Sequence, residues 1–238
     1  MLLGKIIQEI KKKKELKHLD KNFISSRILD YTKQHKINLE KDFSKFSRTS
    51  QYRQMFKEIR KQCRLVYGSF QQVKETRSRE AYEKIFNEAK GNKVLDIGCG
   101  YSPLEYLSIY PEKTYYLCDL DEDAIKKINS FMHNHKIKGK AFLFNPVDQP
   151  ISKLPKADIV LLLKVLESFE AIKRNITYEI LKSLKCKKII ISFSKVALGG
   201  KERIKKSGRL WLRKMLDRLN YRYTISDIDK EIFFFIEK

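Results

Sequence analysis

Apolar residues in the first third of the chain recur at steps of three and four positions. Three groups show the spacing: Ile6, Ile7 and Ile10; Phe23, Ile24, Ile28 and Leu29; Met55, Phe56 and Ile59. Such steps place apolar side chains on one face of a helix. Residues 1–90 contain no proline and only two glycines, so few residues interrupt helices there. We therefore predict an all-helical domain over residues 1–75. A second domain over 76–238 begins with a further helix over 78–89.

From residue 91 the pattern changes to short apolar runs separated by helix-length segments. The runs lie at 94–97, 115–118, 141–144, 159–163 and 188–193. The segments 123–133 and 173–184 have the length of helices. Strands that alternate with helices form a parallel sheet covered on both faces, which predicts an α/β fold of the doubly wound type. Two last runs, 221–225 and 231–236, flank an Asp-rich turn and predict a hairpin that adds antiparallel strands at one edge.

The charge along the chain is strongly positive and uneven. The 238 residues include 51 Lys and Arg against 29 Asp and Glu, a net charge of +22. Residues 1–90 carry 23 basic and 11 acidic residues, residues 91–181 carry 12 of each, and residues 182–222 carry 14 and 2. Two basic blocks around a neutral centre predict a surface that binds the phosphates of a nucleic acid. The alternative explanation is that such lysine runs are solvated helix faces. The expected nucleic-acid contacts in these blocks are Lys11, Lys12, Lys13, Lys14, Lys205 and Lys206.

Cysteine spacing and hydropathy argue against several classes of protein. The four cysteines form no CxxC pair and show no zinc-ligand spacing with the four histidines, so we expect neither a disulfide scaffold nor a metal. No apolar run has the length of a membrane span, and the N-terminal sequence lacks the pattern of a signal peptide. We therefore expect a cytoplasmic protein without a membrane partner.

The strand at 94–97 runs directly into a glycine turn, Asp96-Ile97-Gly98-Cys99-Gly100. Glycines allow a sharp turn and let a ligand approach bare backbone. Asp119 ends the next strand 21 residues after Gly98, where a carboxylate accepts hydrogen bonds from ribose hydroxyls. The third glycine of a dinucleotide loop is absent, and Asp96 would repel a pyrophosphate but attract an ammonium group. These features predict a nucleoside site, with a purely structural turn as the alternative.

This stretch resembles the DxGxG motif of class I S-adenosylmethionine-dependent methyltransferases. The resemblance implies that Asp96, Gly98 and Gly100 hold the methionine part of the cofactor and that Asp119 holds the ribose. It also implies that Asn145 or Asp148, after the third strand, meets the adenine.

A wider set of motifs narrows the resemblance. GCGYSPL, YLCDLD, LLLKVLESFE and ISFSKVALGGK, followed by Trp211, are similar to motifs of the bacterial 16S rRNA guanine-N7 methyltransferases that confer aminoglycoside resistance. The match covers about residues 60–236. It implies a Rossmann-like class I methyltransferase sheet with C-terminal antiparallel edge strands. It also implies that a small basic helical domain precedes this sheet and binds ribosomal RNA. The implied partner is the small ribosomal subunit; we expect no DNA partner and a monomer.

Further site residues follow from this family resemblance. It implies cofactor contacts for Leu163, Lys164 and Glu170. It implies RNA contacts beside the active site for Lys195, Lys201 and Arg203. The family's arginine near the cofactor carboxylate has a shifted counterpart in the segment 76–80, and we choose Arg79. The chain departs from the family pattern where Ser194 replaces a proline and Ala197 a serine, so methyl transfer to RNA is better supported than the target base.

The implied target, guanine N7, has a lone pair and no proton to remove, so methyl transfer to it needs neither a general base nor a covalent nucleophile. The protein then positions the base, and the candidates for this role are Tyr101, Ser194 and Lys195. Three hypotheses stay open at this stage. The chain methylates a decoding-site guanine, or another RNA or base, or it is a ribosome-assembly factor that retains the cofactor site as a relic.

Overall fold

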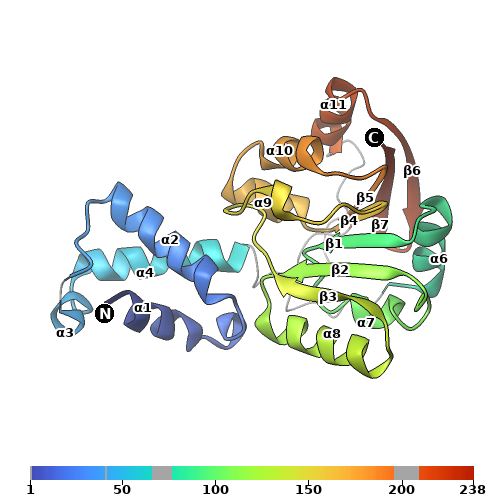
Figure 1. Ribbon diagram of the computed structural model, residues 1–238. Coiled ribbons are helices and arrows are strands. Elements are labelled where there is room, and N and C mark those ends of the chain that lie inside the picture. The colour runs from blue at the N-terminus through green and yellow to red at the C-terminus, as the bar shows by residue number, and fades with distance from the viewer. Residues whose placement is uncertain (1, 41, 66–76, 196–208) are drawn as a thin grey trace. The chain divides into compact units, whose positions relative to one another are not determined.

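The computed structural model describes residues 2–40, 42–65, 77–195 and 209–238 (Figure 1). The chain divides into two compact units. One comprises residues 1–74 together with 120–123, and the other comprises residues 75–119 and 124–238. We refer to them as the helical unit and the sheet unit.

The described part of the helical unit consists of packed helices. They are α1 (Leu2–Lys11), the short 3-10 helix η1 (Lys14–Leu16), α2 (Lys21–Gln34), α3 (Phe43–Phe46) and α4 (Ser50–Cys63). Most of the apolar positions identified in the sequence lie in its core, where Ile6, Ile24 and Met55 are fully buried, whereas Leu29 is 46% exposed. The side chains of Asp20 and Thr49 accept backbone N–H groups at the starts of α2 and α4, which fixes where these helices begin.

Residues 120–123 group with the helical unit through backbone hydrogen bonds and one ion pair. The amide of Asp20 donates to the carbonyl of Leu120 at 2.8 Å. Lys11 donates to the carbonyl of Leu19 at 2.8 Å and pairs with Glu122 at 3.1 Å. The ammonium group of Lys11 is therefore engaged within this unit. In the same run, Lys12 pairs with Glu9.

The sheet unit contains a seven-stranded sheet in the order β3-β2-β1-β4-β5-β7-β6. Its first five strands are parallel, whereas β7 is antiparallel to β5 and β6 to β7. The sequence prediction of a doubly wound α/β sheet with an antiparallel hairpin at one edge is confirmed. The strands are β1 (Lys93–Ile97), β2 (Thr114–Asp119), β3 (Lys138–Leu143), β4 (Ile159–Leu163), β5 (Lys188–Ser194), β6 (Arg222–Ile228) and β7 (Glu231–Glu237).

Helices cover both faces of this sheet (Figure 1). One face packs against α6 (Arg79–Glu88), α7 (Pro103–Tyr106) and α8 (Glu122–Asn134). The other packs against α9 (Leu166–Ile172), α10 (Ile176–Ser183) and α11 (Leu210–Arg218), with the 3-10 helix η3 (Ile151–Lys153) beside them. All five residues of β4 are buried, as expected of a central strand of a parallel sheet. None of the described helices is long and apolar enough to span a membrane.

Two predicted elements differ from the observed ones. The helix expected over 173–184 is α10, which begins only at Ile176, after Asn175, whose φ is +64°. The helix α9, which ends at Ile172, was not among the predicted segments. The third strand begins at Lys138, before the apolar run that predicted it. Its first residues are polar and exposed on a sheet edge, so hydropathy alone did not reveal them.

A substitution at Gly139 in β3 tests the geometry of the pairing between β2 and β3. Its φ is +120°, and a Cβ there would lie 1.8 Å from the carbonyl oxygen of Tyr115 in β2. Gly139→Ala should therefore lower the free energy of unfolding by about 2–4 kcal/mol, from backbone strain and overpacking together. Gly4→Ala is the control, since a Cβ at Gly4 meets nothing within 4 Å. Urea titrations that found the two variants equally stable would contradict the strand geometry.

Candidate functional site

The glycine loop after β1 is anchored to the end of β2. The amides of Gly98 and Cys99 both donate to the carbonyl of Cys118, at 2.7 and 3.1 Å. Gly98 has a φ of +74°, and a Cβ there would come within 2.6 Å of Val165 Cγ1. Only glycine combines this backbone conformation with so close an approach. Gly98 therefore shapes the loop through its contact with the residues after β4.

Gly100 and Asp119 form the open side of the same loop. The amide of Gly100 donates to Asp119 Oδ2 at 2.7 Å, so the carboxylate at the end of β2 is held against the loop. Gly100 also has a positive φ, +53°, but a Cβ there would meet no atom within 4 Å. Among the described residues, the backbone of Gly100 is therefore not covered on this side, and the approach of a ligand there stays a prediction.

Asp96 lies beneath the loop and is almost completely buried, with 1% of its surface exposed. Tyr106 donates its hydroxyl to Oδ2 at 2.8 Å, whereas Oδ1 has no hydrogen-bond partner among the described residues. Burial raises the pKa of this carboxyl to about 7 from its ordinary 3.8, although the Tyr106 hydrogen bond and the charge of Arg77 oppose the rise. A buried acceptor without a partner is costly, and a donor brought by a ligand would satisfy it.

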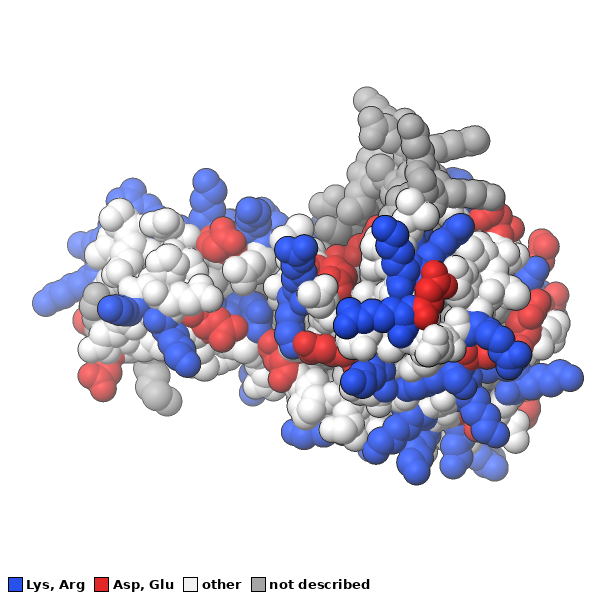
Figure 2. Space-filling view, turned by 90° about the horizontal axis from the view of Figure 1, so that it is seen from above, with Lys and Arg blue, Asp and Glu red and all other residues white. Residues whose placement is uncertain are grey.

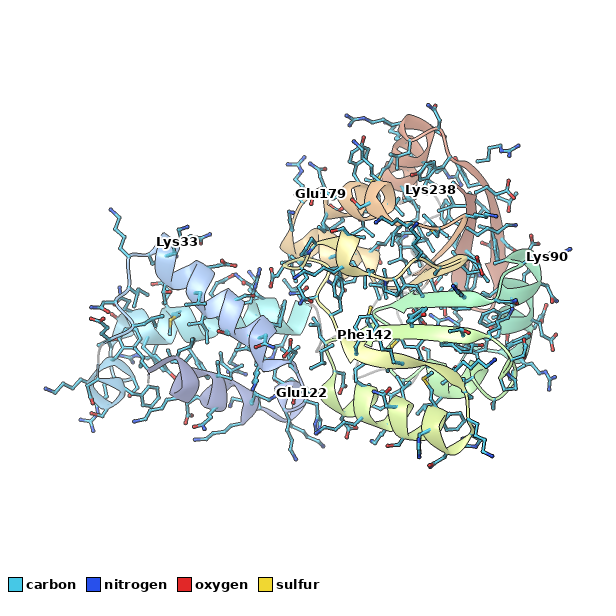
Figure 3. All side chains as sticks on the ribbon, viewed as in Figure 1. Lys33, Lys90, Glu122, Phe142, Glu179 and Lys238 are labelled. Carbon is cyan, nitrogen blue, oxygen red and sulfur yellow. The ribbon has the colours of Figure 1, made fainter. Side chains whose placement is uncertain are left out.

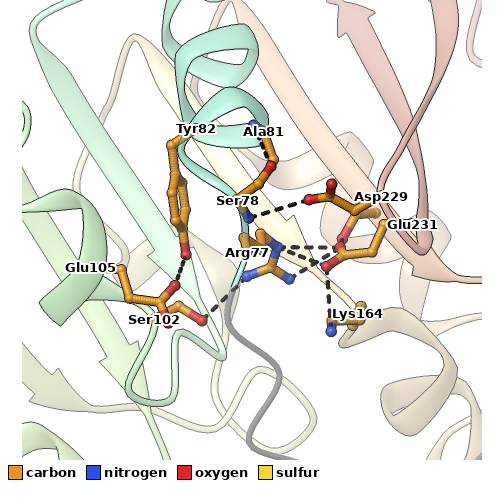
Figure 4. A network of polar contacts seen from close by, with 10 residues as sticks. Arg77, Ser78, Ala81, Tyr82, Ser102, Glu105, Lys164, Asp229 and Glu231 are labelled. Atoms are coloured by element: carbon orange, nitrogen blue, oxygen red, sulfur yellow. Dashed lines mark hydrogen bonds and ion pairs between the residues drawn. The ribbon is translucent and has the colours of Figure 1, made fainter.

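A network of charged side chains lies beside the loop (Figure 4). At its centre is Glu231, the first residue of β7, which is 6% exposed. Arg77 Nε lies 3.0 Å from Glu231 Oε1, and Lys164 Nζ lies 3.3 Å from the same oxygen. Arg77 also donates to Ser102 Oγ at 3.2 Å, which connects the network to the residues after Gly100. Two cations thus share one buried carboxylate next to the glycine loop.

The structure does not bring Arg79 to this place. Arg79 begins α6, its side chain is 76% exposed, and it pairs with Glu83 on the next turn of the same helix. Arg77, two residues earlier, lies against the loop instead, with a side chain only 5% exposed. Because side chains two apart near the start of a helix point in different directions, the choice between the two arginines could not be made from spacing.

Asn145, Asp148 and Glu170, which are predicted cofactor residues, hydrogen-bond to the turn or the helix start beside them. Asn145 Nδ2 donates to Asp148 Oδ2 at 2.7 Å, and Asn145 Oδ1 accepts the amide of Val147, so both side chains help to build the turn after β3. Glu170 accepts the amides of Asn175 and Thr177, each at 2.8 Å, and so caps the start of α10. These contacts give each residue a structural role.

The remaining candidates near the loop lie at strand ends. Leu163 ends β4 and is buried, and Lys164 follows it in a left-handed conformation with a φ of +59°. Ser194 ends β5, and Lys195 follows it, its amide donating to the carbonyl of Lys230. Tyr101 is 40% exposed, and the ammonium group of Lys127 lies 5.3 Å from its ring centre. Four predicted RNA contacts fall outside the described residues: Lys201, Arg203, Lys205 and Lys206.

Basic side chains are abundant on the surface of each unit. Lys and Arg project from much of the face in Figure 2, with acidic side chains between them. In the helical unit Lys33 points away from the helices (Figure 3). Lys13 and Lys14 are exposed, and Lys12 is exposed beside Glu9.

The sequence analysis did not single out Glu231, and it chose Arg79, which is exposed on α6, rather than Arg77, which lies beside the glycine loop. A signal for Glu231 was present, because it is an acidic residue at the head of a strand that is otherwise apolar up to Ile236. Its partners Arg77, Lys164 and Ser192 lie 39 to 154 positions away, a separation that periodicity does not bridge. Within the described ranges, no group of three or more His, Cys, Asp or Glu residues could hold a metal ion.

The sheet order, the antiparallel edge hairpin and the glycine loop between β1 and β2 define a class I methyltransferase fold. The model of the ribosomal RNA methyltransferase (FmrO) family matches residues 71–232, and the chain belongs to this family.

Solved structures agree on the fold. The 16S rRNA methyltransferase RmtF, in complex with S-adenosyl-L-homocysteine, is 14% identical, with a TM-score of 0.75, and the match covers 100% of this chain and 98% of that one. The 16S rRNA methylase RmtB is 15% identical, with a TM-score of 0.73 and coverage of 99% and 98%. An rRNA methylase from Escherichia coli is 18% identical, with a TM-score of 0.70 and coverage of 99% of each chain. Comparison with curated proteins finds no match.

The buried Asp96 predicts a pH-dependent stability. Its pKa is about 7 in the folded protein and about 3.8 in the unfolded chain, so between these values the folded state keeps a proton that the unfolded state releases. The free energy of unfolding therefore falls as the pH rises from 4 to 7, by about 1.4 kcal/mol per unit from this group. Asp96→Asn should lose this component, as measured by urea unfolding at pH 5, 6 and 7.

The matched control is Asp158→Asn. Asp158 accepts the amides of Lys93 and Asn92, and these bonds hold the pKa of its carboxyl below the ordinary value. The contribution of Asp158 to stability is lost only as the pH falls toward that lowered pKa. Between pH 5 and 7 the free energy of unfolding of Asp158→Asn should therefore change with pH as steeply as that of the unaltered protein. Parallel pH profiles of Asp96→Asn and the unaltered protein would contradict the assignment.

Proposed function

We propose that this rRNA methyltransferase transfers a methyl group from S-adenosylmethionine to N7 of a decoding-site guanine in the small ribosomal subunit. The observation that carries the proposal is the loop geometry. Gly100 presents open backbone beside Asp119, above a buried carboxyl oxygen of Asp96 that lacks a donor. The family to which the chain belongs supports RNA as the substrate.

The residues around the loop fit the chemistry of this cofactor. Asp119 would accept the ribose hydroxyls, and the free space above Gly100 would take the nucleoside close to the backbone. The unpartnered Oδ1 of Asp96 suits the cofactor's ammonium group. Arg77 and Lys164, which both approach Glu231, supply positive charge for its carboxylate. S-Adenosylmethionine would supply an electrophilic methyl group on sulfonium.

The target atom accounts for the kind of residues that the site requires. Guanine N7 offers a lone pair and carries no proton, so the protein need only orient the base and exclude water. Tyr101, Ser194 and Lys195 follow strands or turns at the carboxyl edge of the sheet, and we propose that they orient the extruded base. Methylation at this position would protect a susceptible ribosome from aminoglycosides.

The proposal is tested with isolated small ribosomal subunits and radiolabelled S-adenosylmethionine. We expect label in the RNA and, after cleavage specific for N7-methylguanine, a single primer-extension stop at the decoding site. Label at another base or RNA would replace the target, and cofactor binding without label would favour a ribosome-assembly role.

Asp119→Ala is the informative variant in the same assay. Loss of hydrogen bonds to a charged acceptor should weaken cofactor binding by about tenfold to a hundredfold, and RNA binding should be unchanged. Asp217→Ala, an exposed aspartate on α11, is the control and should behave as the unaltered protein. Unchanged cofactor affinity of Asp119→Ala in calorimetry would refute the ribose assignment.

The helical unit gives a second prediction, on RNA affinity. We propose that the exposed Lys13 and Lys14 contact phosphates, whereas Lys11 is engaged by Glu122 and the carbonyl of Leu19. Lys13→Ala and Lys14→Ala should each lower the slope of log K against log salt by about 1 for RNA binding. Lys11→Ala should leave the slope almost unchanged. If Lys13→Ala and Lys14→Ala both kept the slope of the unaltered protein, these lysines would not contact phosphates.

A further inference from the structure

Four donors converge on the carboxylate of Glu231. Arg77 approaches it with Nε and Nη2, and Ser192 Oγ donates to Oε2 at 2.6 Å. Lys164 Nζ completes the set at 3.3 Å from Oε1. Ser192 is fully buried and the side chains of Arg77 and Glu231 are less than 10% exposed, so little water can replace any of these bonds.

Glu231 connects the C-terminal hairpin to the segment that enters α6 and to the glycine loop. Glu231 opens β7 and pairs in register with Ser194 at the end of β5. Two residues earlier, Asp229 accepts the amide of Ser78, so the C-terminal hairpin holds both the backbone and the side chain of the segment that enters α6 (Figure 4). Arg77 in turn reaches Ser102, just beyond Gly100.

We propose that Glu231 is a positioning residue, which aims Arg77 and Lys164 at the carboxylate of the cofactor's amino-acid part. This inference rests on the proposed function. Glu231 accepts hydrogen bonds from Arg77 and pairs with Lys164, and so it fixes the directions of both side chains. Lys164, with 15% of its side chain exposed, is the more accessible of the two.

An amide cannot take the place of this carboxylate. Glu231 offers only acceptors to donors from three residues. Glutamine has nearly the same shape, but its NH2 group would face at least one of these donors and push it away. Removal of the negative charge alone would strengthen the binding of an anion. A weaker affinity for the ligand carboxylate in Glu231→Gln would therefore report lost positioning and not lost charge.

The experiment compares two ligands by calorimetry on the full chain. S-Adenosylhomocysteine carries the amino-acid part, and 5′-methylthioadenosine lacks it. In Glu231→Gln we expect affinity for S-adenosylhomocysteine to fall about tenfold, the scale of one hydrogen bond to a charged group, and affinity for 5′-methylthioadenosine to stay within about twofold. Glu237→Gln, the same substitution at the exposed far end of β7, is the control and should change neither affinity.

The other outcomes each have one meaning. An equal loss for both ligands, no loss, or tighter binding of S-adenosylhomocysteine would overturn the positioning role. If the unaltered protein bound neither ligand, the proposed function would fail and this inference with it. Should Glu231→Gln not fold, Ser192→Ala removes only one of the donors. It should weaken S-adenosylhomocysteine by about threefold and spare 5′-methylthioadenosine; an unselective or absent effect there would also overturn the proposal.

Discussion

The candidate site depends on the close contact between Gly98 and Val165. This contact joins the turn after β1 to the turn after β4. The strands β1 and β4 are neighbours at the centre of the sheet and are paired from Val94 to Asp96 of β1. The loop is held from its other side by the carbonyl of Cys118 in β2. Because three strand ends fix one short loop, its backbone amides and the side chains beneath it have defined positions before any ligand binds. Such preorganisation lowers the ordering cost of binding.

Buried charge is the second constraint on the sheet unit. Taking Glu231 out of water is costly, and the cost is offset only because Arg77, Lys164 and Ser192 supply it with donors. A packed apolar cluster would stabilise the fold as well or better, so stability alone does not explain why ions lie there. Under the proposed function, their place beside the glycine loop supplies the reason, since Arg77 and Lys164 would bind the carboxylate of the cofactor.

Much of this arrangement could be predicted from the sequence, and the reason is local. The strand β1, the turn at Gly98 and Gly100, and Asp119 at the end of β2 lie within 27 residues, and each leaves a mark in residue type and spacing. The apolar character of β4 and β7 likewise follows from burial on both faces. Arg77 could not be distinguished from Arg79 because the distinction is a matter of direction at the start of a helix. Glu231 needs a partner 154 positions away, and no local pattern encodes that distance.

The internal contacts of Asn145, Asp148 and Glu170 show that polar residues at predicted cofactor positions also stabilise turns and a helix start. Each lies at the carboxyl edge of the sheet, where a polar side chain suggests a ligand, yet each is bonded to its own turn or helix start. Turns at this edge require such polar residues, because their backbone amides would otherwise lack acceptors. By contrast, Asp96 Oδ1 lies unpartnered beneath the loop, and Gly100 opens onto free space. The unused hydrogen-bonding capacity of Asp96 therefore supports a ligand contact there, but an internal bond does not exclude one, since Asp119 accepts the Gly100 amide and is also the proposed ribose acceptor.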